Sequence, residues 1–549
     1  MTLPPVALFL VLLVASPLGA ARLGAQEHEQ HLQLGRLGRV SFPVSCNAEA
    51  RRRFEEAMAV LHSFWWEAGD RAFGEVLAAD SSCAMAHWGR ALNAWGNPFA
   101  GGPSGAGLAL GIEAAGQAAA KPLPTAREQG FVNAVVAMYR DASATSSAER
   151  LRAYADTLAR LHRDFSGDVE VTIYHALALV ATAPRTDTTF AQQRRAIALL
   201  NPLYDRYPDH PGLAHYIIHS TDSPTLAPLG LKAARRYSRI APAAPHAQHM
   251  PSHIFVRLGL WNETVSANLQ AFQAGMSHMR ATGAAGPGPE ELHVLDYAVY
   301  GYLQRGRDSA AKAAVARGES LGVVVSRNAL IAEYNRTAMA ARVPLELGDW
   351  AGAASFPGPK ARDSGLSVVL RRFTRGLGAA RRGDTAAARV ELAALDAIGR
   401  SLARRQEPYW ARIAEIKRDA AEAWRRFAAG DTAGGLALAA AAADSEDVTD
   451  KHPVTPAELL PARELQGDLL VAAGRHREAL AAYRATLVRE PGRARSRYGA
   501  GRAAELAGDD EAAAEAYGDY LEAMEGGDGR RPELATARAF LQRRRATSS

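Results

Sequence analysis

Residues 467–491, GDLLVAAGRHREALAAYRATLVREP, and residues 501–520, GRAAELAGDDEAAAEAYGDY, carry the same pattern. Matching positions are 34 residues apart: Gly467 and Gly501, Gly474 and Gly508, Ala479 and Ala513, and Tyr483 and Tyr517. Small residues allow two helices to approach closely, glycine permits the turn between them, and tyrosine packs at their seam. The periodicity predicts pairs of helices stacked one on the next.

The same succession of helix, glycine turn and helix recurs along most of the chain. It is found at 54–91 and around five further glycines: Gly259, Gly306, Gly348, Gly383 and Gly430. The 549 residues are 48% hydrophobic and 22% charged, which excludes wholesale disorder. Alanine, leucine, arginine and glutamate are abundant, and they favour helix. We therefore expect an all-α solenoid of helical hairpins.

The 34-residue pattern closely resembles that of the tetratricopeptide repeat (TPR) family. The stretches 41–46 (SFPVSC), 60–65 (VLHSFW), 83–89 (CAMAHWG) and 212–268, with HAQHMPSHIF, look like a group of exported bacterial TPR proteins without an assigned activity. The resemblance implies a TPR-type helical-hairpin solenoid and leaves the function open. We divide the chain into a signal peptide (1–25), an N-terminal extension (26–47), N-terminal TPR-like helices (48–120), a central TPR-like region (121–350) and a C-terminal TPR array (351–549).

The N-terminus carries a short apolar run, VALFLVLLV, at 6–14. It is too short to span a bilayer and is typical of a signal peptide, with cleavage expected after Ala21 or Ala25. No other stretch reaches about 18 apolar residues, so we expect no membrane span in the mature chain. The protein should be exported, to the periplasm or the medium. The net charge of +6 is spread out, so no nucleic-acid partner is expected.

The two cysteines of the sequence are Cys46 and Cys83. Residues 48–63 and 66–79 are expected to form an antiparallel helix pair. Cys46 precedes the first helix and Cys83 follows the second, so the two should lie at the same end of the pair. In an exported protein they would form a disulfide, worth about 3–4 kcal/mol in a chain-entropy model.

Histidines cluster in the central region. Of the 16 in the chain, six fall between residues 210 and 253: His210, His215, His219, His246, His249 and His253. His215 and His249, and likewise His219 and His253, are 34 residues apart, which equals the repeat period. Residues i and i+4 share one face of a helix, and equivalent helices of successive repeats are neighbours. Four imidazoles should therefore meet on one patch of the concave groove.

Imidazole nitrogen binds zinc, copper and iron well. We take His215, His219, His249 and His253 as the first candidates for a divalent transition metal, and His246, Asp222, His293 and His175 as a second tier. Pro251 leaves two alternatives for the second pair. If Pro251 begins the helix, His249 lies outside it, whereas a kinked helix that starts at Pro245 keeps the i, i+4 geometry. His62 could face the same groove.

Two functions compete. The first is binding of a protein, peptide or small ligand in the groove, with or without a His-bound metal, since repeat solenoids are recognition scaffolds. The second is a metal-dependent enzyme that uses His215, His219, His249 and His253. Buried, hydrogen-bonded histidines without any metal are the alternative to both. The sequence identifies no catalytic residue, and HExxH, GxSxG and Walker A motifs are absent.

Overall fold

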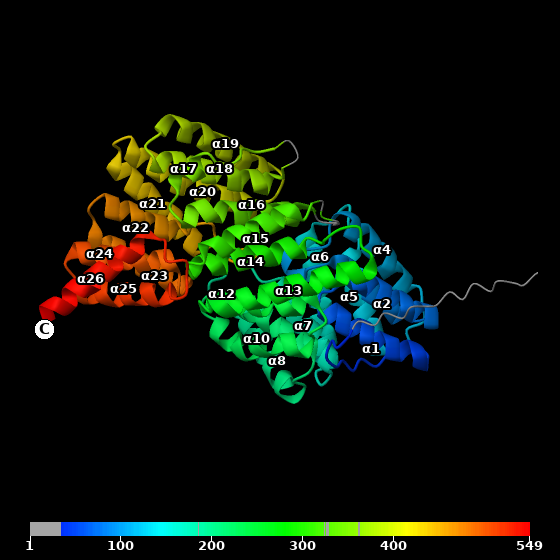
Figure 1. Cartoon of the computed structure of the whole chain (residues 1–549). Coiled ribbons are helices and arrows are strands. Elements are labelled where there is room, and N and C mark those ends of the chain that lie inside the picture. Colours follow the sequence, from blue (N-terminus) through cyan, green and yellow to red (C-terminus); the bar gives the residue numbers. More distant parts are fainter. Residues whose placement is uncertain (1–34, 185, 323, 325–328, 361–362, 549) are drawn as a thin grey trace, which may run out of the picture. The chain divides into compact units, whose positions relative to one another are not determined.

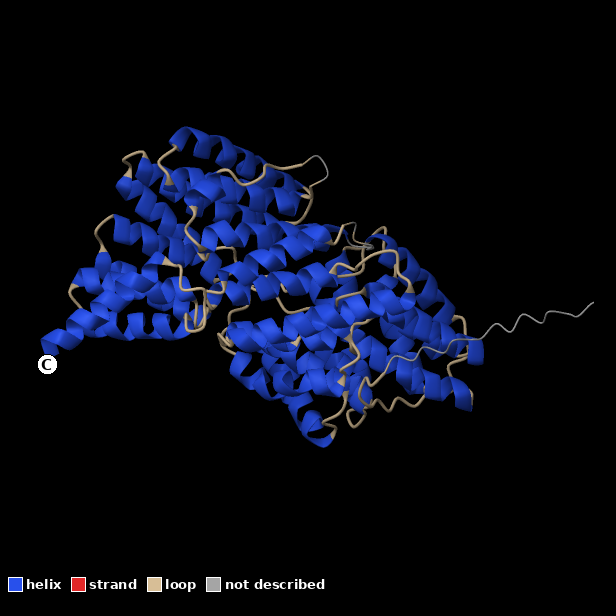
Figure 2. Ribbon diagram, viewed as in Figure 1, coloured by secondary structure: helices blue, strands red, loops and turns tan. Residues whose placement is uncertain are grey.

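The computed structural model describes residues 35–184, 186–322, 324, 329–360 and 363–548. Within these ranges the regular elements are helices and no strand occurs, as expected for an all-α protein (Figure 2). The predicted signal peptide and residues 26–34 of the extension lie outside the described residues. No helix of the described ranges has both the length and the apolar character that crossing a membrane requires.

The helices follow one another along the chain with short connections (Figure 1). Their bounds are α1 Ala48–His62, α2 Trp66–Ala79, α3 Ala84–Trp95, the 3₁₀ turn η1 Pro98–Ala100, α4 Gly105–Ala119, α5 Ala126–Tyr139, α6 Ser147–Asp164, α7 Val169–Ala181, α8 Ala191–Arg206, α9 Pro211–Thr221, α10 Ala227–Ile240, α11 Pro245–His249, α12 Pro251–Arg257, α13 Trp261–Thr282, α14 Glu290–Gln304, α15 Asp308–Ser320, α16 Ala329–Glu346, α17 Trp350–Ala354, α18 Gly365–Arg381, α19 Thr385–Arg404, α20 Pro408–Ala428, α21 Thr432–Asp447, α22 Ala462–Ala472, α23 His476–Arg489, α24 Ala494–Ala507, α25 Asp510–Ala523 and α26 Pro532–Ser548.

Consecutive helices pack against each other in pairs. Each pair also contacts the next pair through the equivalent helix of both. Among the pairs are α9 with α10, α18 with α19, α20 with α21 and α24 with α25. Among the contacts between successive pairs are α7 with α9, α9 with α12, α16 with α18, α18 with α20 and α22 with α24. This arrangement is the predicted TPR-type solenoid.

The 34-residue pattern has a direct structural cause. A Cβ atom on Gly467 would lie 2.9 Å from the Tyr483 ring, and one on Gly501 would lie 2.6 Å from the Tyr517 ring. Both distances are too short for a side chain, so glycine lets each tyrosine pack into the seam of its helix pair. Gly474 turns the chain between α22 and α23 with φ at +75°, a conformation that few other residues adopt without strain.

Cys46 and Cys83 form a disulfide, with their Cα atoms 5.2 Å apart. Cys46 lies just before α1, and Cys83 caps the N-terminus of α3. The bond therefore joins the two ends of the α1–α2 pair, as the sequence predicted.

The C-terminal repeats fold back against the central region. Trp261 on α13 donates from Nε1 to the carbonyl of Gly492 at 3.0 Å, and Tyr300 on α14 donates to Glu490 Oε2 at 3.0 Å. Buried Arg342 on α16 binds Asp296 and the carbonyl of Ala457. Residues 448–461, between α21 and α22, thereby reach the central helices. The division at 120/121 and 350/351 stays a prediction.

Candidate metal centre

Four helices bring six histidines together. They are His215 and His219 on α9, His246 and His249 on α11, His253 on α12 and His293 on α14. Pro211 and Pro245 open α9 and α11, because proline suits the first turn of a helix. The repeat therefore starts both histidine-bearing helices at the same point relative to their HxxxH pairs.

The connection between α11 and α12 decides the geometry of the second pair. Met250 joins the two helices with helical dihedral angles, φ −51° and ψ −36°. Pro251 has no N–H to donate, so one hydrogen bond of the turn is lost while the chain continues in the same direction. His249 and His253 stay on one face, with their Nε2 atoms 3.0 Å apart. The structure combines the two alternatives: Pro251 begins α12, so His249 lies outside that helix at the end of α11, yet the i, i+4 geometry is kept.

The first group, here called triad A, consists of His249, His253 and His293. The Nε2 atom of His249 lies 3.0 Å from that of His253 and 3.0 Å from that of His293. On the opposite side of each ring, Nδ1 faces an oxygen atom. These oxygens are Asn268 Oδ1 at 2.6 Å from His249, Asp222 Oδ2 at 2.8 Å from His253 and the Val454 carbonyl at 3.1 Å from His293.

These oxygens determine where the ring protons lie in triad A. A neutral imidazole carries one N–H, and a carbonyl or carboxylate oxygen can only accept. The amide of Asn268 is oriented by its Nδ2, which donates to the Thr264 carbonyl at 2.7 Å, so Oδ1 faces His249. Each Nδ1 therefore carries the proton, and three Nε2 lone pairs point toward one another.

The second group, here called triad B, consists of His215, His219 and His246. The Nε2 atoms of His215 and His219 are 3.1 Å apart. His215 donates from Nδ1 to the carbonyl of His62 at 2.6 Å, and His246 Nδ1 lies 2.8 Å from Glu290 Oε1. One possible ligand nitrogen from each ring of the triad lies within 4.8 Å of the others, and the same holds for triad A.

The two triads are neighbours. The ring centroids of His219 and His253 are 6.0 Å apart, and those of His246 and His249 are 5.8 Å apart. Each i, i+4 pair is completed by a histidine near the start of the next equivalent helix, His246 on α11 and His293 on α14. The sequence placed both of these residues in its second tier, and the structure brings both to the cluster.

A third group, here called the Glu170 network, is built differently. Glu170 on α7 accepts from His62 Nε2 at 3.0 Å and from His210 Nε2 at 2.9 Å. His62 Nδ1 then accepts from the Tyr216 hydroxyl at 3.0 Å. A carboxylate between two N–H donors satisfies both donors without an ion, although the buried Nδ1 atom of His210 has no hydrogen-bond partner among the described residues. His62 therefore does not face the triads, although its backbone carbonyl holds His215.

Five of the six triad histidines are buried and His246 is half-buried, rather than exposed in an open groove, which corrects the expected placement. His215 and His249 are 0% exposed, and even the side chain of His246 is only 13% exposed. Phe64 and Phe99 cover triad B, with ring centroids 5.6 Å from His246 and 3.9 Å from His219, respectively. The fold-back of residues 448–461 covers triad A, because Val454 and its neighbours pack over His293.

Burial also decides the charge of the imidazoles. It lowers the pKa of His249 and of His293 to about 3 and that of His253 to about 4. The pKa values of His215 and His219 fall well below the usual 6.5 for the same reason. These five rings are neutral at pH 7, and the neutral form is the one that binds a metal.

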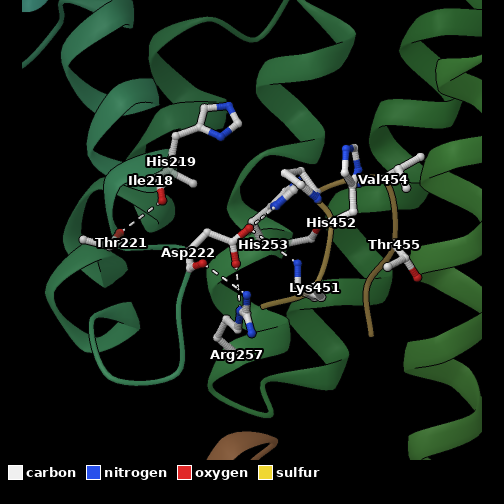
Figure 3. Close-up of polar contacts among 12 residues, drawn as sticks. Ile218, His219, Thr221, Asp222, His253, Arg257, Lys451, His452, Val454 and Thr455 are labelled. Carbon is white, nitrogen blue, oxygen red and sulfur yellow. Dashed lines mark hydrogen bonds and ion pairs between the residues drawn. The ribbon is translucent and has the colours of Figure 1, made fainter. Parts of the chain in front are cut away.

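Asp222 orients His253 and belongs to a buried charge cluster (Figure 3). Its carboxylate lies 2.8 Å from Arg257 Nε and 3.5 Å from Lys451 Nζ. Burial alone would raise the pKa of Asp222, but the charges of Lys451 and Arg257 hold it well below its usual range. Of the two roles open to Asp222, ligand or orienting partner, the geometry matches the partner.

Several groups at the site were not singled out from the sequence. Glu290 and Asn268 hold His246 and His249, and Val454 holds His293 through its backbone. The hydroxyl of Tyr297 lies 3.3 Å from the carbonyls of Pro453 and Thr455 and 3.4 Å from His253 Nε2. Glu290 and His293 are three residues apart in the sequence, a helical spacing that was an available signal, and both lie at the start of α14. No sequence pattern near the histidines indicated that residues 450–455 belong to the site.

His175, the remaining second-tier candidate, does not join either triad. Its ring stacks on His162, with centroids 5.0 Å apart. Burial lowers its pKa to about 4. α7 packs on α9, yet the His175 ring lies against α6, so being one repeat away was not sufficient to bring it to the cluster.

The fold and the cluster define a class, a helical-repeat protein with buried, converging imidazoles. No protein-family model matches the chain, and no curated protein matches it. Similar solved structures include a human IFIT1 dimer with m7Gppp-AAAA, at a TM-score of 0.33 and 12% identity over 80% of this chain and 89% of that one. Yeast Tom70 has a TM-score of 0.29 and 10% identity over 90% of both chains. The TPR domain of P58(IPK) has a TM-score of 0.21 and 12% identity over 68% of this chain and 99% of that one. TM-scores this low carry no argument about function.

Proposed function

We propose that this protein is a metal-dependent enzyme whose centre is a divalent transition-metal ion bound by triad A. One observation carries the proposal: the Nδ1 atoms of His249, His253 and His293 each face an oxygen acceptor, which assigns the ring protons to Nδ1, and Nε2 of His249 lies 3.0 Å from each of the other two. Lone pairs facing each other at 3.0 Å repel unless a cation lies among them.

A metal ion fits this arrangement better than a proton. A proton on one Nε2 is directed to one acceptor, and it buries an imidazolium at high cost. The Tyr297 hydroxyl lies 3.4 Å from His253 Nε2 but is closer to the Pro453 and Thr455 carbonyls, at 3.3 Å. Two nitrogens bound at about 2.0–2.1 Å to one ion lie roughly 2.9–3.4 Å apart for angles of about 90–110°. The Nε2 separations of 3.0 Å fall in that range.

The donor set narrows the identity of the ion. Three neutral imidazoles suit zinc, copper or iron, whereas magnesium and calcium take oxygen ligands. Asp222 and Asn268 accept from the ligand rings, as outer partners do in metal sites. Three protein ligands leave a coordination position open, which is the pattern of catalytic rather than structural sites. This favours the enzyme over a metal that only stabilises the fold.

Binding of a protein or peptide by the repeats is the second candidate, favoured by the solenoid fold. Such a ligand would use the outer helix surfaces, because the imidazoles are too buried for a chain to reach. The two candidates differ in one respect: a pure scaffold keeps partner binding when the metal is removed.

We also infer that the protein works outside the cytoplasm. The apolar run at 6–14 and the Cys46–Cys83 disulfide support export, since disulfides persist in oxidising compartments. Mass spectrometry of the secreted chain should give a mature N-terminus at residue 22 or 26. An intact N-terminus on the exported protein would contradict the signal-peptide assignment.

Elemental analysis of protein purified without a His tag tests the metal centre. We expect at least one zinc, copper or iron ion per chain in wild type, and none at triad A in His253→Ala. Asp222 retains Arg257 and Lys451 in that variant, so no buried charge is left alone. His476→Ala on α23, outside the cluster, is the matched control. A wild-type protein that binds no ion under any loading condition would falsify the proposal.

A further inference from the structure

Triad B repeats the construction of triad A one helix pair earlier. We propose that His215, His219 and His246 bind a second ion of the same metal, and that the two ions share a small oxygen ligand between them. This inference rests on the proposed function, because it adds a second ion to the one at triad A. It defines a two-ion centre with imidazole ligands on both sides.

The nitrogen geometry of triad B supports an ion. His215 carries its proton on Nδ1, since that atom faces the carbonyl of His62. His246 likewise directs Nδ1 to Glu290, and its buried Nε2 has no hydrogen-bond partner within the described part of the chain. An unpaired buried lone pair beside two further imidazole nitrogens is costly without a ligand. A metal ion would satisfy all three rings at once.

The proximity of the triads makes the two ions a pair rather than two separate sites. The ring of His219 is a neighbour of the His253 ring and that of His246 a neighbour of the His249 ring, with centroids 6.0 and 5.8 Å apart. Ions held on the facing sides of these rings are close enough to share a ligand, as in two-metal sites with ions roughly 3.5–4 Å apart. The 34-residue duplication supplies the two halves.

Charge defines the class of the shared ligand. Imidazole ligands bring no negative charge of their own, and each triad has one carboxylate behind a ring, Glu290 behind His246 and Asp222 behind His253. Asp222 is already neutralised by Arg257 and Lys451. The protein carboxylates would therefore balance only a small part of the charge of two adjacent divalent ions. An anionic ligand that bridges the ions reduces their mutual repulsion.

The cover over the cluster limits the size of that ligand. Phe64 and Phe99 pack on triad B, and the ring of Tyr297 lies 4.8 Å from His249 in triad A. None of the six histidine side chains exceeds 13% exposure. So enclosed a site excludes a peptide or a sugar as the bridging ligand. Water, hydroxide and anions of similar size are thus the ligand class of this centre.

Copper(II) titration with electron paramagnetic resonance tests the inference. Wild type should bind about two Cu²⁺ ions per chain. Their combined signal should be well below two full spins, because ions bridged by one ligand couple their unpaired electrons. Azide, a small anion that replaces bridging oxygen ligands, should shift the visible absorption of the copper-loaded protein. His246→Ala should bind one ion with one full spin, and His476→Ala should behave as wild type.

The outcomes separate the two proposals. One ion with a full spin in wild type overturns the second site and leaves triad A standing, while no bound ion overturns both. Two ions with two full spins, unaffected by azide, overturn the shared ligand. If His246→Ala fails to fold by circular dichroism, His246→Asn and the wild-type stoichiometry decide the same question.

Discussion

Triad A and the Glu170 network look alike at first sight. Each is buried, and each brings three potential ligands within 4.8 Å of one another. In the network, both Nε2–H groups donate to one carboxylate, so each polar contact has a donor and an acceptor. In triad A the acceptors lie behind the rings, and the Nε2 atoms in front face one another, with the Tyr297 hydroxyl 3.4 Å from that of His253. Histidines that merely lie close together are therefore weak evidence for a metal site. An oxygen acceptor at Nδ1, on the side of the ring away from the other histidines, is stronger evidence.

Removing one ligand should have the largest effect. His253→Ala leaves two imidazoles in triad A, so its affinity for zinc or copper should fall by more than the roughly 10–100-fold typical for loss of an outer partner. Isothermal titration with each metal measures the change. Glu170→Gln, which alters the Glu170 network, should have the metal affinity of wild type. An equal loss of metal affinity in both variants would contradict the distinction between triad A and the Glu170 network.

Breaking the network should act on stability instead. In Glu170→Gln two buried histidine N–H groups lose their charged acceptor, and a hydrogen bond to a charged group contributes about 1.5–3 kcal/mol to stability. Urea unfolding of the metal-free protein checks this. Asp209→Asn breaks only an exposed pair with Arg236 and should change the free energy of unfolding by less than about 1 kcal/mol.

The pH dependence of the metal-free protein should separate the two regions further. The pKa of His253 is about 4 in the fold, so the unfolded chain, with a histidine pKa near 6.5, binds the proton more readily. Stability should fall as the pH drops from about 6.5 toward 4, with His253 contributing about 2 kcal/mol of the loss by pH 5. His62, whose pKa burial also lowers, acts in the same window.

Glu170 adds a second window at lower pH. Burial raises its pKa, but His62 and His210 outweigh this and lower it to about 2, so its contribution is present above pH 4.5 and lost as the pH approaches 2. In thermal melts between pH 7 and 3, His253→Ala should weaken the dependence of the melting temperature on pH in the first window. Glu170→Gln should weaken it in the second window. Identical pH profiles for both variants would contradict the assignment.

The smallest effect should come from the orienting carboxylate. Asp222→Asn keeps the size of the side chain and an acceptor oxygen but removes the charge behind His253. Metal affinity at triad A should fall by about 10-fold, the lower end of the range for outer partners. Competition with a chromogenic chelator measures it. No change, with folding intact, would mean that Asp222 serves only the cluster with Arg257 and Lys451.

Much of this protein could be predicted from its sequence because the determining patterns are local or periodic. The spacing of Gly467 and Tyr483 follows from the close approach of two paired helices. The Cys46–Cys83 pairing follows because the antiparallel helices α1 and α2 bring their outer ends together. The i, i+4 spacing of His249 and His253 placed them on one face, because Met250 keeps helical dihedral angles between α11 and α12. These features depend on residues less than about one repeat apart.

The sequence by itself determined the helical-hairpin array, the disulfide and the two HxxxH pairs. Only the tertiary structure decided that His246 and His293 complete them, that His175 does not, and that the cluster is enclosed. The reason is geometric. Which ring points inward depends on the rotation of each helix against its neighbour, and the acceptor for His293 comes from Val454, 161 residues away, because the C-terminal repeats fold back on the central ones.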